Sequence, residues 1–480
     1  MSDPFPAPIY AETVLSHNFE DAKKYFLDAL IEIHYAHTRM LAGCGLLTRE
    51  EEGKLLAALH GLDRTRIASA HFDGSAEDLF FFIEGLLERA AGRELAGKMH
   101  MARSRNDIAV TLYRMTARRE ILGTARALAD LRTVLLRFAA DHVMTVMPAH
   151  THTQPAQPTT LAHYVLGAIE FLARDSARLQ AAFSRVNLSP MGAAAITTSG
   201  FAIDRDATAR LLGFEGLAEN SYGAIAAIDY ITETAAAVAV AMINIGKLVQ
   251  DLLLWSTREF GYLRLSDAFV QTSSIMPQKR NPVALEHVRI LASRTLGEAQ
   301  AVLTCAHNTP FGDVNDSEDD LQPLVFTMFA DARRALRLLA GALGTAQVDT
   351  ALMADRARRD FLTVTELADT LVRREGLSFR EAHALVADAV RACGPGDDPA
   401  SLAAALRNVR PGLRLTAQEI ERCLDPEHFV QIRTVTGGPA REQTSAALER
   451  ATAEQKQIET WIASTEAGLD AARASVTRSP

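Results

Sequence analysis

The feature that most constrains the fold is a run of long helical patterns through the middle of the chain. One of them, 224–260, is apolar on nearly every face, and a helix of that kind must be buried by more than one neighbour. Four others cover 110–146, 159–186, 283–308 and 321–345, whereas strand-like alternation is scarce. The sequence therefore predicts an all-α fold built around a central bundle of five long helices.

Composition changes on either side of these five helices. The predicted helices before them, 19–44 and 48–67, are shorter, and those after residue 350 are interrupted by Gly- and Pro-rich breaks at 394–399 and 437–439. A charged helix is expected at 442–474, followed by a frayed polar tail. We predict three domains: an N-terminal helical domain (1–103), a central long-helix bundle domain (104–350) and a C-terminal helical domain (351–480).

Charge and targeting signals indicate which classes of partner the chain is not expected to have. The 480-residue chain has a net charge of −9 and no basic block, so nucleic acid is an unfavourable partner. Residues 1–17 lack the pattern of a signal peptide, and the most apolar stretch, 234–245, is shorter than the roughly 20 residues of a membrane span. The four cysteines form no Cys-x-x-Cys pair. We expect a cytoplasmic protein with no membrane partner.

The segment 272–282 concentrates three hydroxyls, two cations, two amides and two prolines. Pro277 and Pro282 disfavour helix before them, so an ordered loop is expected, with Pro282 as the first residue of the next helix. A donor-rich loop that leads into a helix N-terminus favours negative charge. The alternative interpretation is a polar surface turn.

Two further segments carry polar groups suited to catalysis. In 98–107, Arg103 and Arg105 can grip a carboxylate while Ser104 and Asn106 add neutral donors; the alternative is a solvated surface. In 150–158, a histidine on an extended, proline-braced segment is either a general acid or base or a structural residue.

Metal binding has little support in the second of these segments. His150 and His152 are close in sequence, but no carboxylate or cysteine stands at ligand spacing. We therefore predict no metal site.

The loop 272–282 resembles the signature of the fumarase/aspartase superfamily, Ser-Ser-x-Met-Pro-x-Lys-x-Asn-Pro, matched without a gap from Ser273 to Pro282. From about 19 to 451 the chain is most similar to the argininosuccinate lyase branch. Segment 98–107 resembles the branch's His-Thr-Gly-Arg-Ser-Arg-Asn-Asp block with Met101-Ala102 replacing Thr-Gly, and 150–158 resembles Gly-Tyr-Thr-His-Leu-Gln-x-Ala-Gln-Pro. The resemblance implies a cofactor-independent lyase that cleaves C–N or C–O bonds by anti elimination, usually releasing fumarate.

The resemblance also assigns roles to residues. Ser273 would be the base, acting as an alkoxide, although the residues alone do not separate it from Ser274. His152, oriented by Glu286, would assist proton transfer, and Lys279 would act with Ser273. The residues implied to bind substrate are Ser104, Arg105, Asn106, Thr151, Gln154, Ser274, Asn281, Asp313 and Glu318. Family members form homotetramers with a 20-helix core, in which each active site draws its motifs from three subunits.

The chain departs from the branch where the amine half of the substrate should bind. The family's Tyr-Asn-Lys-Asp-Leu-Gln-Glu-Asp-Lys corresponds here to 313–321, with Asp313 for tyrosine, Glu318 for glutamine and Leu321 for the last lysine. The family's Asp-Ile-x-Gly-Ser block is replaced at 30–34. These changes remove partners of an amino-acid carboxylate and add acids that favour a cationic amine. A solvated acidic face is the alternative.

These departures set the functional expectation. We expect a C–N lyase acting on an N-succinyl amine, an aminopolycarboxylic acid such as ethylenediamine-N,N'-disuccinate (EDDS), the substrate of another member of the branch. One alternative is the argininosuccinate lyase of arginine biosynthesis. Another is a non-catalytic relative like the eye-lens crystallins, which the intact Ser273, His152 and Lys279 argue against.

Overall fold

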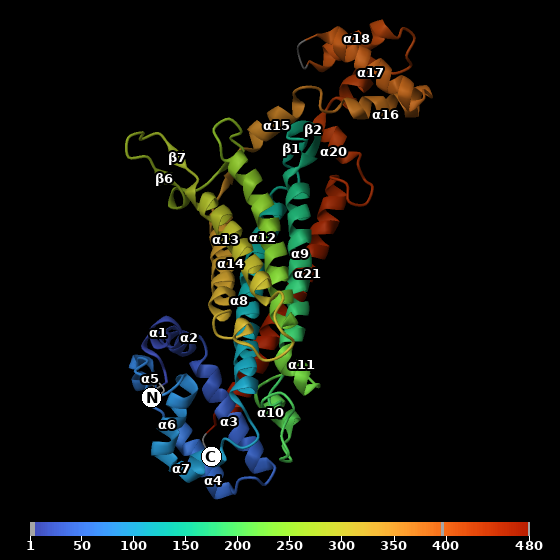
Figure 1. Ribbon diagram of the computed structural model, residues 1–480. Coiled ribbons are helices and arrows are strands. Elements are labelled where there is room, and N and C mark those ends of the chain that lie inside the picture. Colours follow the sequence, from blue (N-terminus) through green and yellow to red (C-terminus); the bar gives the residue numbers. More distant parts are fainter. Residues whose placement is uncertain (1–4, 395–397, 479–480) are drawn as a thin grey trace.

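A computed structural model describes residues 5–394 and 398–478. The chain is mostly helical: a long bundle carries a group of short helices from the N-terminal part at one end and a smaller group from the C-terminal part at the other (Figure 1). Because short strands are also present, all-α holds only in the sense of mostly helical.

The five predicted bundle helices are confirmed, with shifted ends. They are α8 (Arg105–Asp141), α9 (Leu161–Val186), α12 (Asp229–Trp255), α13 (Val283–Ala306) and α14 (Gln322–Leu343). A single helix over 224–260 was wrong, because α11 (Ser221–Ala226) ends before α12 begins. Pro282 occupies the N-cap of α13 rather than its first turn.

A sixth long helix, α21 (Arg441–Val476), lies along α8 and α9 (Figure 1). It is fixed there by the buried Arg132 of α8, which donates to Gln455 Oε1 at 2.8 Å and to Glu454 Oε2 at 2.8 Å. Helix α21 continues two residues past the predicted end, and Arg39 donates to the Val476 carbonyl at 2.8 Å. The expected fraying of the tail stays a prediction. The domain boundaries at 103/104 and 350/351 stay a prediction.

The N-terminal helices pack around their own apolar core. The predicted helix 19–44 is divided at Phe26, and 48–67 is divided at Gly61. A capping box between Thr48 and Glu51 starts the second of these, as the sequence indicated. The elements are α1 (Pro8–Tyr10), the π-helical turn η1 (Ala11–Leu15), α2 (Ser16–Tyr25), α3 (Leu27–Gly43), α4 (Arg49–His60), α5 (Arg64–Ser69), α6 (Leu79–Ala91) and α7 (Arg93–Lys98).

The group at the far end has a separate small core that includes Leu371, Leu406 and Ile420. The predicted break at 394–399 lies partly outside the described residues. The helices are α15 (Thr350–Arg358), α16 (Val364–Glu375), α17 (Phe379–Cys393), α18 (Pro399–Val409), α19 (Ala417–Cys423) and α20 (Pro426–Gln431).

Within the part of the chain that the structure describes, four two-stranded sheets join the helices. Three are antiparallel, and the pair β3–β4 is parallel and lies beside α10 (Arg205–Leu211). Two of the antiparallel hairpins carry the motifs 150–158 and 272–282. The pairs are β1 (Val146–Thr151) with β2 (Gln154–Thr160), β3 (Leu188–Ser189) with β4 (Gly216–Leu217), β5 (Leu263–Arg264) with β8 (Gln347–Val348), and β6 (Gln271–Thr272) with β7 (Arg280–Asn281).

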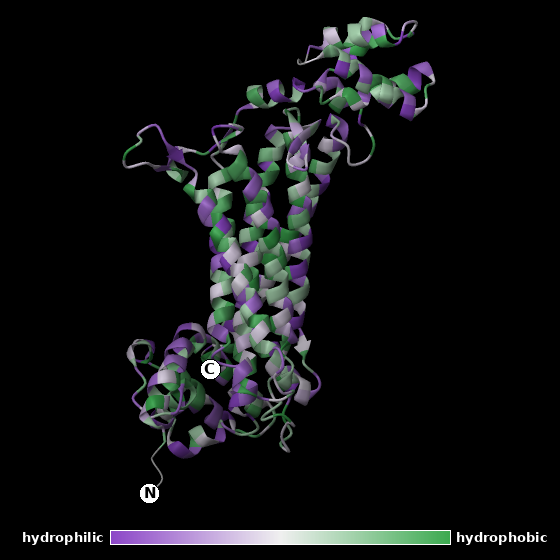
Figure 2. Cartoon of the chain, turned by 45° about the horizontal axis from the view of Figure 1, so that its top comes forward, coloured by the Kyte–Doolittle hydropathy of each residue, from purple (hydrophilic) through white to green (hydrophobic). Residues whose placement is uncertain are grey.

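Helix α12 is longer than the apolar stretch 234–245 suggested. Among the described residues it is the one helix long and apolar enough to cross a membrane. It instead packs against α9 and α13, and Val238, Ile245 and Val249 are buried in the largest core. Apolar residues run along the bundle helices among polar ones (Figure 2), which fits helices that bury each other.

Candidate active site

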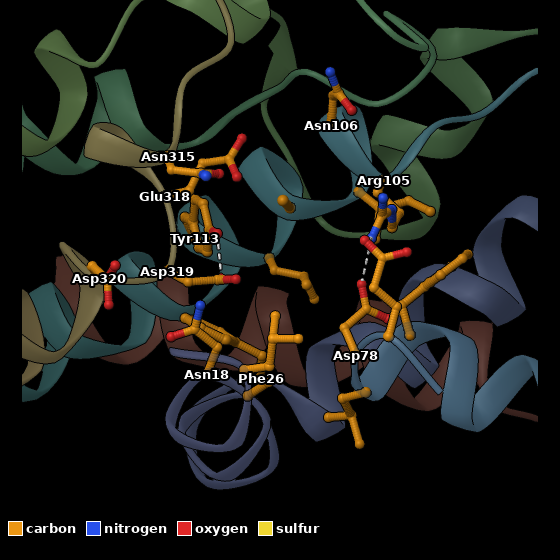
Figure 3. Close-up of a pocket in the computed structure, with 18 of the residues that line it drawn as sticks. Asn18, Phe26, Asp78, Arg105, Asn106, Tyr113, Asn315, Glu318, Asp319 and Asp320 are labelled. Carbon is orange, nitrogen blue, oxygen red and sulfur yellow. Dashed lines mark hydrogen bonds and ion pairs between the residues drawn. The ribbon is translucent and has the colours of Figure 1, made fainter. Parts of the chain in front are cut away.

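A cavity of about 350 Å³ lies where the N-terminal helices meet the bundle (Figure 3). Its walls come from α2, the start of α6, the first turns of α8 and the loop before α14. It brings together four residues that the sequence analysis placed in the site: Arg105, Asn106, Asp313 and Glu318. Residues far apart in the sequence therefore share one cavity.

The first turn of α8 positions the predicted carboxylate-binding residues. Ser104 is the N-cap, and its backbone N–H donates to Asp107 Oδ1 at 2.9 Å in a capping box. Arg105 and Asn106 follow as the first two helical residues, so their side chains leave the helix at its N-terminal edge. The Ser104 hydroxyl donates to Asn106 Oδ1 at 3.0 Å, which fixes the amide.

Arg105 is already paired with acids in this chain. Its Nη1 donates to Glu77 Oε1 at 3.0 Å and to Asp78 Oδ2 at 2.9 Å (Figure 3). Its guanidinium lies over the Phe81 ring. Sequence reasoning missed both acids. The one local signal was that Asp78 precedes an apolar run, and it does cap α6 by accepting from the Phe81 N–H at 2.8 Å.

The wall opposite Arg105 is acidic (Figure 3). Asn106 Nδ2 donates to Asp313 Oδ2 at 2.7 Å, and the Tyr113 hydroxyl donates to Asp319 Oδ1 at 2.9 Å. Burial raises the pKa of Glu318 to about 8, and the hydrogen bond and charge of Asp313 act in the same direction. Burial also raises the pKa of Asp319.

The cavity as a whole is rich in acids and also has an apolar side. Six acids and a single cation, Arg105, are among the described residues that line it. The acids are Glu77, Asp78, Asp313, Glu318, Asp319 and Asp320. The apolar side includes Val14, Leu15 and Phe26. Such a space favours a ligand that combines positive charge with an alkyl stem.

The motif 150–158 forms the β1–β2 hairpin. Its two turn residues, His152 and Thr153, have φ of 50° and 62°, as a two-residue type I′ turn requires. Thr151 and Gln154 face each other across this turn. The sequence predicted the extended segment but not the hairpin, because neither turn residue is the usual asparagine or glycine. His152 stands exposed at the tip.

The superfamily signature forms a loop that projects from the bundle between β6 and β7 (Figure 1). Ser273 Oγ accepts from the backbone N–H groups of Ile275 and Met276 at 3.3 and 3.1 Å, so the hydroxyl is held inside its own turn. Ser274 and Lys279 are exposed in the loop, and Glu286 is exposed in the first turn of α13.

One subunit does not assemble all of these groups. The cavity lies at one end of the bundle, whereas the hairpin of His152 and the loop of Ser273 lie toward the other end (Figure 1). Helix α13 alone, with 24 residues, spans about 36 Å between the loop and the acidic wall. Among the hydrogen bonds of the described residues, none joins His152 to Glu286.

Within 5–394 and 398–478, no three His, Cys, Asp or Glu side chains are grouped so as to hold a metal ion.

Known proteins similar to this chain span nearly all of it. Argininosuccinate lyase 2 of Agrobacterium fabrum is 43% identical over 446 residues, covering 91% of this chain and 88% of the relative. Argininosuccinate lyase of Methanoculleus marisnigri is 40% identical over 456 residues, covering 94% and 92%. A solved variant of EDDS lyase with bound fumarate is 32% identical, has a TM-score of 0.87, and covers 99% of this chain and 98% of its own.

Two family models match in addition. A model described as "Lyase" matches residues 81–297, and one described as "Argininosuccinate lyase C-terminal" matches residues 361–431. The resemblance drawn from the three motifs is thereby confirmed. The chain belongs to the argininosuccinate lyase branch of the fumarase/aspartase superfamily and is a fumarate-releasing carbon–nitrogen lyase.

Proposed function

We propose that this lyase releases fumarate from an N-succinyl amine by anti elimination, with Ser273 as the base. The Ser273 alkoxide removes the proton next to a carboxylate, which becomes a dianionic aci-carboxylate held by Lys279 and Asn281. The C–N bond then breaks, its electron pair leaves with nitrogen, and nitrogen takes up a proton. The reverse reaction adds an amine to fumarate. No electrons are gained or lost overall, so no redox cofactor is required, and the substrate carboxylate itself serves as the electron sink.

The observation that carries this proposal is the contact of Asn106 with Asp313 in one cavity. Asn106 Nδ2 lies 2.7 Å from Asp313 Oδ2, and Arg105 lines the same space. Hydrogen-bond donors that can bind the succinyl carboxylate thus lie next to acids that can bind a cationic amine. An N-succinyl amine has these two halves joined by the bond that is cleaved.

Binding the succinyl group requires Arg105 to exchange partners. Its side chain is 44% exposed and its acidic partners Glu77 and Asp78 are 41% and 35% exposed. Ion pairs with this exposure contribute about 0–1 kcal/mol each. A substrate carboxylate can therefore replace one of the acids at small cost.

The proposed active form is a homotetramer with a 20-helix core. Two exposed apolar side chains on α12, Ile243 and Leu254, and two on α13, Ile290 and Leu303, support it, since such residues favour burial against other copies. Three subunits would then supply the cavity, the hairpin bearing Thr151, His152 and Gln154, and the loop bearing Ser273. Glu286 would orient His152 there. We also propose a cytoplasmic location.

For the amine half we propose an aminopolycarboxylic acid such as EDDS. Its second nitrogen suits the acidic wall at Asp313, Glu318 and Asp319, and the resemblance to a solved EDDS lyase across 99% of the chain supports it. The second candidate is argininosuccinate, which the names of the relatives at about 40% identity favour. Leu321 in place of the family's lysine disfavours argininosuccinate.

The test uses purified protein and follows the formation or consumption of fumarate by its ultraviolet absorbance. Argininosuccinate, adenylosuccinate and EDDS are offered for cleavage, and fumarate with a series of amines is offered for addition. We expect EDDS to be cleaved faster than argininosuccinate, with rates unchanged by dialysis against a chelator. If no succinyl compound and no amine–fumarate pair reacts, the proposed reaction is refuted.

A further inference from the structure

Asp107 lies directly behind the residues that line the cavity. Asp107 is fully buried, with 0% of its surface exposed. Its carboxylate accepts three backbone hydrogen bonds. Oδ1 accepts from Ser104 N at 2.9 Å, and Oδ2 accepts from Gly192 N at 2.9 Å and Ala194 N at 3.0 Å. One carboxylate therefore ties the start of α8 to a loop 85 residues away.

The tied loop has an unusual backbone. Gly192 has φ of 86° and Ala194 has φ of 52°, a region that side chains with a Cβ rarely adopt. A Cβ at Gly192 would lie 2.7 Å from Arg205 Cγ, so the loop passes close to that side chain. A strained loop keeps its shape only where its surroundings fix it, and the two N–H bonds to Asp107 do so here.

The loop in turn reaches a residue of the candidate site. Asn106 Nδ2 donates to the Ala195 carbonyl at 3.2 Å as well as to Asp313 at 2.7 Å. Its Oδ1 accepts from the Ser104 hydroxyl at 3.0 Å. Two of the three neighbours that fix the Asn106 amide, Ser104 and Ala195, belong to segments held by Asp107.

We propose that Asp107 is a positioning residue for dicarboxylate binding, which it serves by locking Asn106 and Ser104 in place. This inference rests on the proposed function, because it takes Asn106 to bind the succinyl group. Asp107 lines no part of the cavity itself. It acts by holding two segments at a fixed separation, and a shift of about 1 Å in binding groups can cost about a hundredfold in rate.

The direct test is Asp107→Asn. The amide keeps the shape but turns one acceptor into a donor that faces backbone N–H groups. We expect kcat/KM for fumarate addition to fall about 10- to 100-fold, chiefly through a higher KM for fumarate, while tetramer formation and the circular dichroism spectrum stay unchanged. The matched control is Asp130→Asn, an exposed position on the same helix. A KM for fumarate equal to that of the control would overturn the inference.

Coupling to Asn106 separates positioning from a general effect on the fold. In an Asn106→Ala background, Asp107→Asn should raise the KM for fumarate less than about threefold, because the side chain taken to bind the succinyl group is gone and only Ser104 is still positioned. Fully multiplicative effects would contradict the proposal. If Asp107→Asn does not fold, Gly192→Ala replaces it, since the added Cβ displaces the loop while the carboxylate stays. The same KM effect and the same coupling are expected.

A pH profile supplies an independent measurement. Burial raises the pKa of Asp107 to about 6, against three backbone N–H groups that lower it, and the charged groups that face it are Arg103 and Arg205. The KM for fumarate of the unmodified enzyme should therefore rise as pH falls below about 6, and this rise should be absent in Asp107→Asn. If the KM of Asp107→Asn rises just as much at low pH, a group other than Asp107 causes the rise. If the unmodified enzyme acts on no substrate, the proposed function is refuted. If it is active and Asp107→Asn leaves the KM for fumarate unchanged, only this inference is refuted.

Discussion

Mixing two inactive variants tests whether the active site is shared between subunits. Arg105→Ala removes a cation at the cavity, and Lys279→Ala removes one from the loop at the other end of α13. The helix separates these positions by about 36 Å in one chain, so they cannot serve the same substrate from one subunit. Each charge-assisted contact contributes roughly 1.5–3 kcal/mol, which corresponds to a loss of about one to two orders of magnitude. We expect the larger loss for Lys279→Ala, since Arg105 must first leave Glu77 and Asp78.

The expected recovery follows from random assembly. When equal amounts of the two variants are dissociated and reassembled, half the subunits carry an intact Arg105 and the other half an intact Lys279. A site that takes these residues from two subunits is complete with probability one quarter, so activity should return to about 25% of the unmodified enzyme. The assay is fumarate absorbance after reassembly, with mixed tetramers verified by native mass spectrometry.

A second mixture provides the control. Arg105→Ala and Asn106→Ala alter adjacent residues of the same turn, so every site formed from their mixture retains one defect. Recovery should be absent there. Equal recovery in both mixtures, or none with Lys279→Ala, would refute the shared site.

Two further predictions concern Ser273 and Glu318. Ser273→Ala should lower kcat by orders of magnitude while KM changes little, because a base acts mainly in the transition state; full turnover in Ser273→Ala with loss in Ser274→Ala would move the base by one residue. The pKa of Glu318 is raised from 4.5 to about 8, mainly by burial. Between these pH values the folded chain keeps a proton that the unfolded chain has lost, so stability falls as pH rises. Glu318→Gln should therefore raise the free energy of unfolding, relative to the unmodified protein, more at pH 8 than at pH 5, by about 1–2 kcal/mol after solvent screening; an equal difference at both pH values would contradict the buried acid.

Local sequence signals located the elements but not their contacts. The apolar period predicted the five bundle helices, and the Thr48–Glu51 cap was readable because capping involves residues three apart. The break at Phe26 was missed because no Gly or Pro marks it. The His152–Thr153 turn was missed for the same reason: its left-handed φ values are imposed by strand pairing rather than by the residues themselves.

In the candidate site, too, the sequence predicted which residues take part but not which residues they contact. Arg105 and Asp313 were assigned to one site through family motifs, and the structure brings them into one cavity. The pairing of Arg105 with Glu77 and Asp78 left no sequence signal, because an ion pair between residues 27 or 28 apart has no period. The path of α21 along α8 is equally non-local, since its charged surface resembles that of a solvated helix.

The most direct test of the account measures the KM for the amine and the KM for fumarate in variants of the acidic wall. Asp313→Asn and Glu318→Gln are assayed in fumarate addition above pH 8, where Glu318 is ionised, beside Asp316→Asn, an acid of the same loop that does not line the cavity. If the wall selects the amine, the first two should raise the KM for the amine by about five- to a hundredfold, or roughly 1–3 kcal/mol. The KM for fumarate should stay within about twofold, and Asp316→Asn should change neither. Efficient cleavage of argininosuccinate that is indifferent to both substitutions would contradict the account and favour argininosuccinate as the substrate.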